Sequence, residues 1–313
     1  MKKIILFCCC FGLAALSLQA GARRETASRP LQVGLVPAVD ALPLMLANDR
    51  GYFAEEGVDV NLVLFPNPQE MDAAVQAGHL DGAILNLLGA IFLNAGGFDY
   101  KVTSITNGRF GIVASPQSGI TSLAGLKGAQ VGVFLNQMIH YIVDSLLESD
   151  GVSPSEYEAV AVPNILLRLE MVLGGLLDAA CLPEPLLTAA VAQGAVLLAT
   201  TDNTGLESGV LVFSGKVLNN RLNEVQAFYR AYYKAAMEIN ADPDHFRDYL
   251  VEQAGFPPSV RDTFQFVKFT EPILPDDNQI NRSLNWLTTR GLLNIELSPS
   301  DVTDSRAISE WFN

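Results

Sequence analysis

Short apolar runs alternate with segments of helical period along most of the chain. The apolar runs predict strands at 31–36, 58–65, 100–106, 110–114, 130–134, 159–162, 195–200 and 209–213. Apolar residues that recur three and four positions apart predict helices at 41–48, 69–77, 87–95, 138–149 and 166–174. Because strands and helices alternate through both halves, the pattern predicts an α/β protein with mainly parallel sheets flanked by helices.

A six-residue pattern, Gly-x-Leu-Asp-x-Ala, occurs at 78–83 and again at 175–180. In each copy a helical run leads to a glycine that can end a helix in the left-handed conformation, and a short apolar run predicts a buried strand. These strands end near Asn86 and at Glu184, which lies between two prolines. Since ligands of open α/β sheets lie at the carboxyl ends of strands, the repeat predicts two lobes that face one another across a cleft. A plain helix–turn–strand connector is the alternative, and it does not exclude the cleft.

Composition limits the classes of partner. The chain has 313 residues, 49% of them hydrophobic, and a formal net charge of −14. This length is enough for two lobes with a large buried core. A chain this acidic should bind neither nucleic acid nor an anionic membrane surface well because like charges repel, and neither partner is expected.

Residues 1–22 have the pattern of a secretory signal peptide. Two lysines precede an apolar run at 4–18, and Ala20-Gly21-Ala22 fits a small-x-small cleavage site. We therefore expect an exported, periplasmic protein. Three of the four cysteines lie in this segment at positions 8–10, too early in the apolar run to favour a lipid anchor. The fourth, Cys181, falls in a predicted buried strand and is expected to be a core thiol.

An ordered set of short motifs resembles a known family. Residues 46–47, 51–53 and 56–60 (LA, GYF and EGVDV) resemble the opening of the periplasmic solute-binding proteins that serve importers of nitrate, sulfonates and thiamine precursors. Further matches follow in the same order at 77–81, 119–128, 131–133, 175–180, 184–185 and 228–231. Each motif alone is weak, but the set covers nearly all of the chain after residue 30.

The resemblance implies a fold, a partner and a mechanism. It implies a type II periplasmic-binding-protein fold, with the first lobe at 30–108 and 205–313, the second at 109–204, and a hinge of two crossover segments. From residue 219 only helices are predicted, at 224–239, 243–254, 258–264 and 278–290, and this tail is expected to wrap the first lobe and the back of the hinge. Such a protein is a monomer without a cofactor that closes around a small solute and delivers it to a membrane ABC permease.

The candidate ligand-binding residues are polar side chains at predicted strand ends: Asp40, Asn67, Asn86, Asn107, Arg109, Asn136, Gln137, Asn164 and Glu184. Asn and Asp at such positions also serve as helix caps and turn residues, and that alternative applies to each of them. Glu184 is the most informative, because flanking prolines restrict the backbone around it. Arg109 is the main cation expected near the cleft, and a solvated turn arginine is its alternative.

Three alternatives remain for the chemistry of the site. Anion binders of this class often place a small, hydroxyl-bearing pair before the helix of the second lobe, where this chain has residues 135–138 (LNQM). This departure favours a neutral, zwitterionic or heteroaromatic solute over nitrate or a sulfonate. Thiamine-pyrimidine synthases share the fold and carry a cysteine-rich motif in the mature domain, whereas here Cys8-Cys9-Cys10 lie in the signal segment, so no enzyme is expected.

The histidines do not predict a metal site. His79, His140 and His245 are scattered along the chain and have no partner at ligand spacing. His140 lies at the start of a predicted helix and is expected at the surface or at the rim of the cleft.

Overall fold

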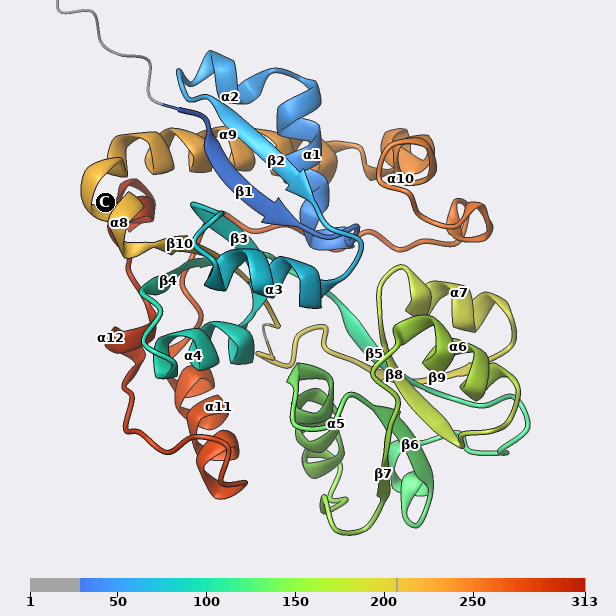
Figure 1. Cartoon of the computed structure of the whole chain (residues 1–313). Coiled ribbons are helices and arrows are strands. Elements are labelled where there is room, and N and C mark those ends of the chain that lie inside the picture. The colour runs from blue at the N-terminus through green and yellow to red at the C-terminus, as the bar shows by residue number, and fades with distance from the viewer. Residues whose placement is uncertain (1–28, 207, 313) are drawn as a thin grey trace, which may run out of the picture.

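The computed structural model describes residues 29–206 and 208–312, so the predicted signal peptide lies outside the described part. Ten strands form two five-stranded sheets (Figure 1). One sheet has the order β2-β1-β3-β10-β4, with β1 at Leu31–Leu35, β2 at Val60–Leu64, β3 at Gly82–Asn86, β4 at Tyr100–Ile105 and β10 at Gly209–Ser214. The other has the order β7-β6-β8-β5-β9, with β5 at Phe110–Ala114, β6 at Gln130–Val133, β7 at Glu158–Ala161, β8 at Ala179–Pro183 and β9 at Val196–Thr200. The two-lobed α/β prediction is confirmed.

The two sheets share one topology, in which a parallel part is joined to an antiparallel part. In the first sheet β1 runs parallel to β2 and β3, and in the second β6 runs parallel to β7 and β8. β10 and β5 are antiparallel to their neighbours. Both follow a crossover from the other lobe, so they enter their sheet from the edge where the parallel strands end. The sheets are therefore mixed.

The helices pack on both faces of the sheets. Their bounds are α1 Leu42–Asp49, α2 Tyr52–Glu55, α3 Pro68–Gln76, α4 Leu87–Ala95, α5 Met138–Ser149, α6 Ile165–Leu173, α7 Leu186–Ala192, α8 Gly215–Asn220, α9 Leu222–Ala241, α10 Arg247–Glu252, α11 Asp277–Thr289 and α12 Pro299–Val302. Short 3-10 turns lie at Val39–Ala41 (η1), Leu123–Leu126 (η2), Pro243–Phe246 (η3), Pro258–Val260 (η4) and Arg306–Phe312 (η5). Within the described ranges, no helix is both long and apolar enough to cross a membrane.

Two predicted helices of the tail are wrong in extent. The segment predicted at 258–264 forms only the single turn η4, after which the N–H groups of Thr263 and Phe264 both donate to the carbonyl of Val260 and Phe264 enters the core. The segment predicted at 243–254 divides into η3 and α10. Helix α7 was not predicted.

The repeated pattern joins each helix to the sheet through its aspartate. The first glycine of each copy has a φ of +72° or +73°, in the left-handed region. In the first copy the N–H of Asp81 donates to the carbonyl of Gln32 at 2.8 Å, and its side chain accepts from the N–H of Gln32 at 2.9 Å. In the second copy Asp178 makes the same two bonds with Gln130, at 3.0 and 2.8 Å. The aspartate therefore ties the start of β3 or β8 to the neighbouring parallel strand.

The leucine of the pattern packs on a strand glycine. A Cβ at Gly34 would lie 2.6 Å from Cδ1 of Leu80, and a Cβ at Gly132 would lie 2.6 Å from Cδ1 of Leu177. Each glycine thus leaves room for the leucine to close the turn against the sheet. The two lobes repeat this packing together with the hydrogen bonds of the aspartate.

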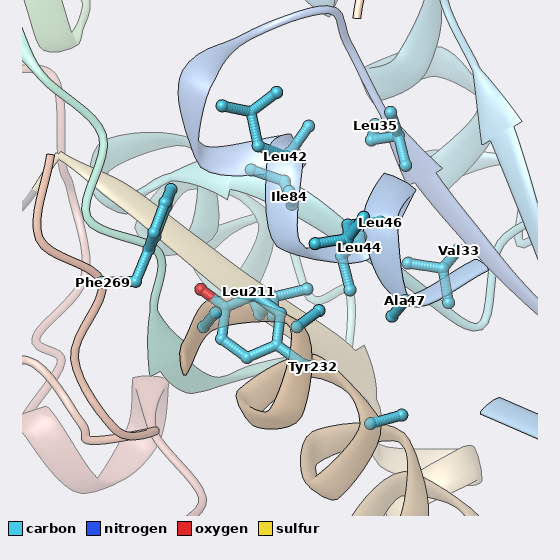
Figure 2. Packing of buried hydrophobic residues seen from close by; sticks show 14 of the residues in the cluster. Val33, Leu35, Leu42, Leu44, Leu46, Ala47, Ile84, Leu211, Tyr232 and Phe269 are labelled. Carbon is cyan, nitrogen blue, oxygen red and sulfur yellow. The ribbon is translucent and has the colours of Figure 1, made fainter. Parts of the chain in front are cut away.

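The tail covers the first lobe and also reaches the second. Helix α9 packs on α1 and α2, and Figure 2 shows Tyr232 of α9 and Phe269 of the following segment in one apolar cluster with Leu42 and Leu211. Helix α11 packs on α4 of the first lobe, and Trp286 and Arg290 at its end contact Asp144 of α5 in the second (Figure 1). Much of the tail thus packs on elements of the first sheet, and it also contacts α5 and α7 of the second lobe.

Candidate functional site

Two crossover segments run side by side between the sheets. Residues 106–109 connect β4 to β5, and residues 201–208 connect β9 to β10. The N–H of Thr106 donates to the carbonyl of Gly209 at 3.0 Å, and the N–H of Thr201 donates to the carbonyl of Phe110 at 2.9 Å. The carboxyl ends of the parallel strands in both sheets point toward these segments, as the topology requires. The polar residues that follow these strands therefore share one region between the lobes.

Arg109 bridges both crossovers and the tail. Its Nε donates to Oδ1 of Asp202 at 2.9 Å, and an NH group donates to the carbonyl of Gln265 at 2.8 Å. The same guanidinium lies 3.9 Å from Oε1 of Glu184, at the end of β8. The side chain of Arg109 is only 13% exposed. It is therefore not a solvated turn arginine, and two carboxylates already balance its charge.

Glu184 is buried where the second lobe meets the crossovers. It is 4% exposed and follows β8. Oε2 accepts from the N–H of Thr188 at 3.1 Å, and Oε1 accepts from the hydroxyl of Thr188 at 3.0 Å, at the start of α7. Burial raises the pKa of Glu184 above its ordinary value, and the bonds from Thr188 and the charge of Arg109 oppose that rise. The carboxyl group thus caps a helix at the sheet edge.

Asp40 is a second buried carboxyl group, and it lies between the crossovers. It belongs to η1, directly after β1, and its Oδ2 accepts from the hydroxyl of Thr106 at 2.9 Å. A Cβ at Gly209 would lie 2.6 Å from the same oxygen and closer still to the Thr106 hydroxyl, so this glycine packs against the hydrogen-bonded pair. Burial raises the pKa of Asp40 to about 6, although the bond from Thr106 lowers it. The expected helix-cap role is not seen, because Ala41 precedes α1 as its N-cap.

The loop before α5 presents two amide side chains at the same edge. Asn136 has a φ of +60°, and its N–H donates to Nδ1 of His140 at 3.2 Å. Gln137 is the N-cap of α5 but makes no side-chain capping bond. Asn136 is exposed and Gln137 is half-buried. Both residues lie in the loop that follows β6.

The other four candidates have structural contacts. The side chains of Asn67, Asn86 and Asn164 are N-caps, each accepting from a backbone N–H of α3, α4 or α6 at 2.8 to 2.9 Å. Asn107, with a φ of +59°, accepts from the N–H of Thr270 at 3.0 Å and ties the first crossover to the tail. Contact of any of the nine candidates with a ligand stays a prediction.

Arg168 is a buried cation that the sequence analysis missed. It is 0% exposed, and one NH group donates to the carbonyl of Val162 at 2.9 Å, just beyond β7. Its Nε and NH2 groups have no acceptor among the described residues. Burial lowers its pKa. The sequence feature that could have indicated it is a single arginine within the largely apolar segment 165–173.

Within the described ranges, no three His, Cys, Asp or Glu side chains are grouped so as to hold a metal ion. The rim position expected for His140 is wrong, because it is 5% exposed and packs perpendicular to Trp286. Cys181 is fully buried, and burial raises its pKa to about 12, so the prediction of a core thiol is confirmed.

The fold is that of the two-lobed periplasmic solute-binding proteins. The aliphatic sulphonate binding protein SsuA from Escherichia coli superposes with a TM-score of 0.77, at 16% identity, over 88% of this chain and 97% of that one. The alkanesulfonate-binding protein SsuA from Xanthomonas axonopodis pv. citri, bound to MOPS, superposes with a TM-score of 0.73, at 19% identity, over 88% and 98% of the two chains.

The chain belongs to the family described as NMT1/THI5 like, whose model matches residues 38–246. The 4-amino-5-hydroxymethyl-2-methylpyrimidine phosphate synthase of Schizosaccharomyces pombe is 30% identical over 123 residues. That stretch spans 38% of this chain and only 35% of the length of the synthase.

Proposed function

We propose that the protein is an extracytoplasmic solute-binding protein, which captures a small molecule between its lobes and delivers it to a membrane ABC permease. The observation that carries this proposal is the convergence of two sheets of like topology on a pair of crossover segments. We assign residues 30–108 and 205–313 to one lobe, residues 109–204 to the other, and the hinge to the crossovers. The neighbours of known structure with this fold support export to the periplasm.

Entry of a solute requires the lobes to part. Helices α4 and α5 are in contact across the lobes, and α7 contacts η4. These contacts belong to the closed arrangement, so a solute must favour closure over opening to be retained. A ligand shifts such an equilibrium only through its different affinity for the two states.

The polar groups at the strand ends favour a neutral, zwitterionic or heteroaromatic solute. The cation Arg109 is already balanced by Asp202 and Glu184. Two carboxyl groups and two amides share this region, which suits a ligand with N–H donors better than an anion. Buried acidic groups disfavour a sulfonate or nitrate, since like charges in a poorly solvated site repel strongly.

Sulfonate binding remains the second candidate because of the two structural neighbours. A pyrimidine synthase is the third, because of the named relative. The cysteine-rich motif associated with such synthases has no counterpart beyond residues 8–10, since the remaining cysteine is the buried Cys181.

The test is a thermal-shift screen of the chain against pyrimidines and other heteroaromatics, amino acids, alkanesulfonates and nitrate. A ligand at 100 times its dissociation constant should stabilise the folded state by about 2.7 kcal/mol. The shift should be lost in Asn136→Gly, which removes the side chain without straining the left-handed backbone. Arg230→Ala is the matched control, because Arg230 pairs with Glu56 and Glu310, far from the crossovers.

Two results would contradict the proposal. Selective binding of nitrate or an alkanesulfonate would overturn the ligand class and leave the transport role. Conversion of a bound compound, followed by mass spectrometry of the recovered ligand, would overturn the transport role in favour of the enzyme.

A further inference from the structure

Asp144 of α5 is a buried carboxylate whose partners come from both lobes. It is 0% exposed. Within the second lobe it accepts from the hydroxyl of Tyr157 at 2.6 Å. From the tail it accepts from Nε1 of Trp286 at 2.8 Å and from the guanidinium of Arg290. A carboxylate this deeply buried is costly unless it is paired, so the contacts from the tail are the ones that balance its charge.

Helix α11 carries Trp286, has Arg290 as its C-cap residue, and packs on α4 of the first lobe. Its buried residues Ile280, Leu284 and Leu287 belong to an apolar cluster that includes α4. The guanidinium of Arg290 lies 4.5 Å from the centre of the Trp286 ring. The helix therefore connects α4 to α5 in addition to the two crossovers, and Asp144 accepts its hydrogen bonds on the second lobe.

His140 links this attachment point to the loop that faces the solute. Its Nε2 lies 3.8 Å from Oδ1 of Asp144, and its Nδ1 accepts from the N–H of Asn136. Accepting at Nδ1 requires the neutral ring with its proton on Nε2, the nitrogen that faces Asp144. Burial lowers the pKa of His140 and so favours this neutral form, although the charge of Asp144 opposes it.

We propose that Asp144 and α11 form a clasp that holds the loop 134–137 in its ligand-facing conformation through His140. Asp144 is then a positioning residue, because it acts on the solute only through His140 and Asn136. That loop is ligand-facing only if the proposed function holds, whereas the clasp is a physical property of the chain alone.

The test is hydrogen exchange at the Asn136 amide in the full chain, measured by NMR without ligand. In Arg290→Ala the guanidinium is lost, and we expect exchange at Asn136 to become roughly tenfold faster through local opening. Arg290→Lys keeps a cation at this exposed helix end, so the exchange rate of the Asn136 amide should stay close to that of the unsubstituted chain. Trp286→Phe keeps an aromatic ring at this position but removes the N–H donor, and it should raise the exchange rate of the Asn136 amide by less.

The control is Arg230→Ala, whose ion pairs lie within the first lobe. The clasp would be overturned if the Asn136 amide exchanged at the same rate in Arg290→Ala as in the unsubstituted chain. An equal acceleration in Arg230→Ala would also overturn it, because the effect would then be general destabilisation. If Arg290→Ala does not fold, the exchange rate of the Asn136 amide in Trp286→Phe is compared with that of the unsubstituted chain, and an equal rate overturns the clasp. None of these outcomes depends on whether the protein transports a solute or transforms one.

Discussion

Replacing Asp40 by Asn should remove a pH-dependent cost of folding beside the first crossover segment. The carboxyl group is buried, accepts from the hydroxyl of Thr106 and packs against Gly209, so it is poorly solvated in the folded state. An Asn side chain has nearly the same shape, and its carbonyl oxygen can accept the same bond from Thr106. The substitution therefore changes the charge while leaving the packing close to the original.

The size of the effect follows from the raised pKa of Asp40. Its folded-state pKa is about 6, against the ordinary 3.8 of the unfolded chain, and this difference corresponds to about 3 kcal/mol. Between these two values the folded protein holds a proton that the unfolded chain has released, so stability falls as pH rises. From about pH 4 to pH 7, Asp40 should lower the free energy of unfolding by about 2.4 kcal/mol.

The assay is urea unfolding, followed by circular dichroism, for the unsubstituted chain and Asp40→Asn across this range. The advantage of Asp40→Asn should be small near pH 4 and should grow by about 2 kcal/mol toward pH 7. Asp59→Asn, at an exposed position, is the control for the general effect of removing one negative charge. A difference between Asp40→Asn and the unsubstituted chain that is constant with pH would refute the reasoning, because it would place the pKa of Asp40 at its ordinary value.

Three further predictions concern the repeated pattern and the core of the second lobe. Gly132→Ala should destabilise by about 1–3 kcal/mol in chemical unfolding, because the new Cβ would lie 2.6 Å from Cδ1 of Leu177; an unchanged unfolding midpoint would contradict the close packing. Asp178→Ala should cost about 1–3 kcal/mol by the same measurement, since the N–H of Gln130 would lose its acceptor. Cys181 should not react with a thiol reagent until the protein unfolds, because its thiol is buried and its pKa is about 12; reaction with the native protein at the rate of a free thiol would disprove its burial.

The placement of a candidate residue was predictable where it depends on position in the chain. Residues after predicted strands lie at the sheet edge, so the places of Glu184 after β8 and Asn136 after β6 followed from strand ends alone. Their contacts were not predictable in the same way. The bonds of Arg109 to Asp202 and to Gln265 join residues 93 and 156 positions apart. No local pattern fixes which of several acidic side chains will meet a given arginine.

The sequence by itself determined the ten strands, the two repeated connectors and the two-lobed α/β class. These depend on hydrophobic period and on glycine and aspartate at turns, which act over a few residues. The tertiary structure alone decided that β5 and β10 are antiparallel, that the tail reaches the second lobe, and that Asp144, Trp286 and Arg290 meet. Such contacts join residues more than 140 positions apart. These contacts depend on how the lobes and the tail pack in space. A charge that this packing buries must be paired, because an unpaired buried charge is costly.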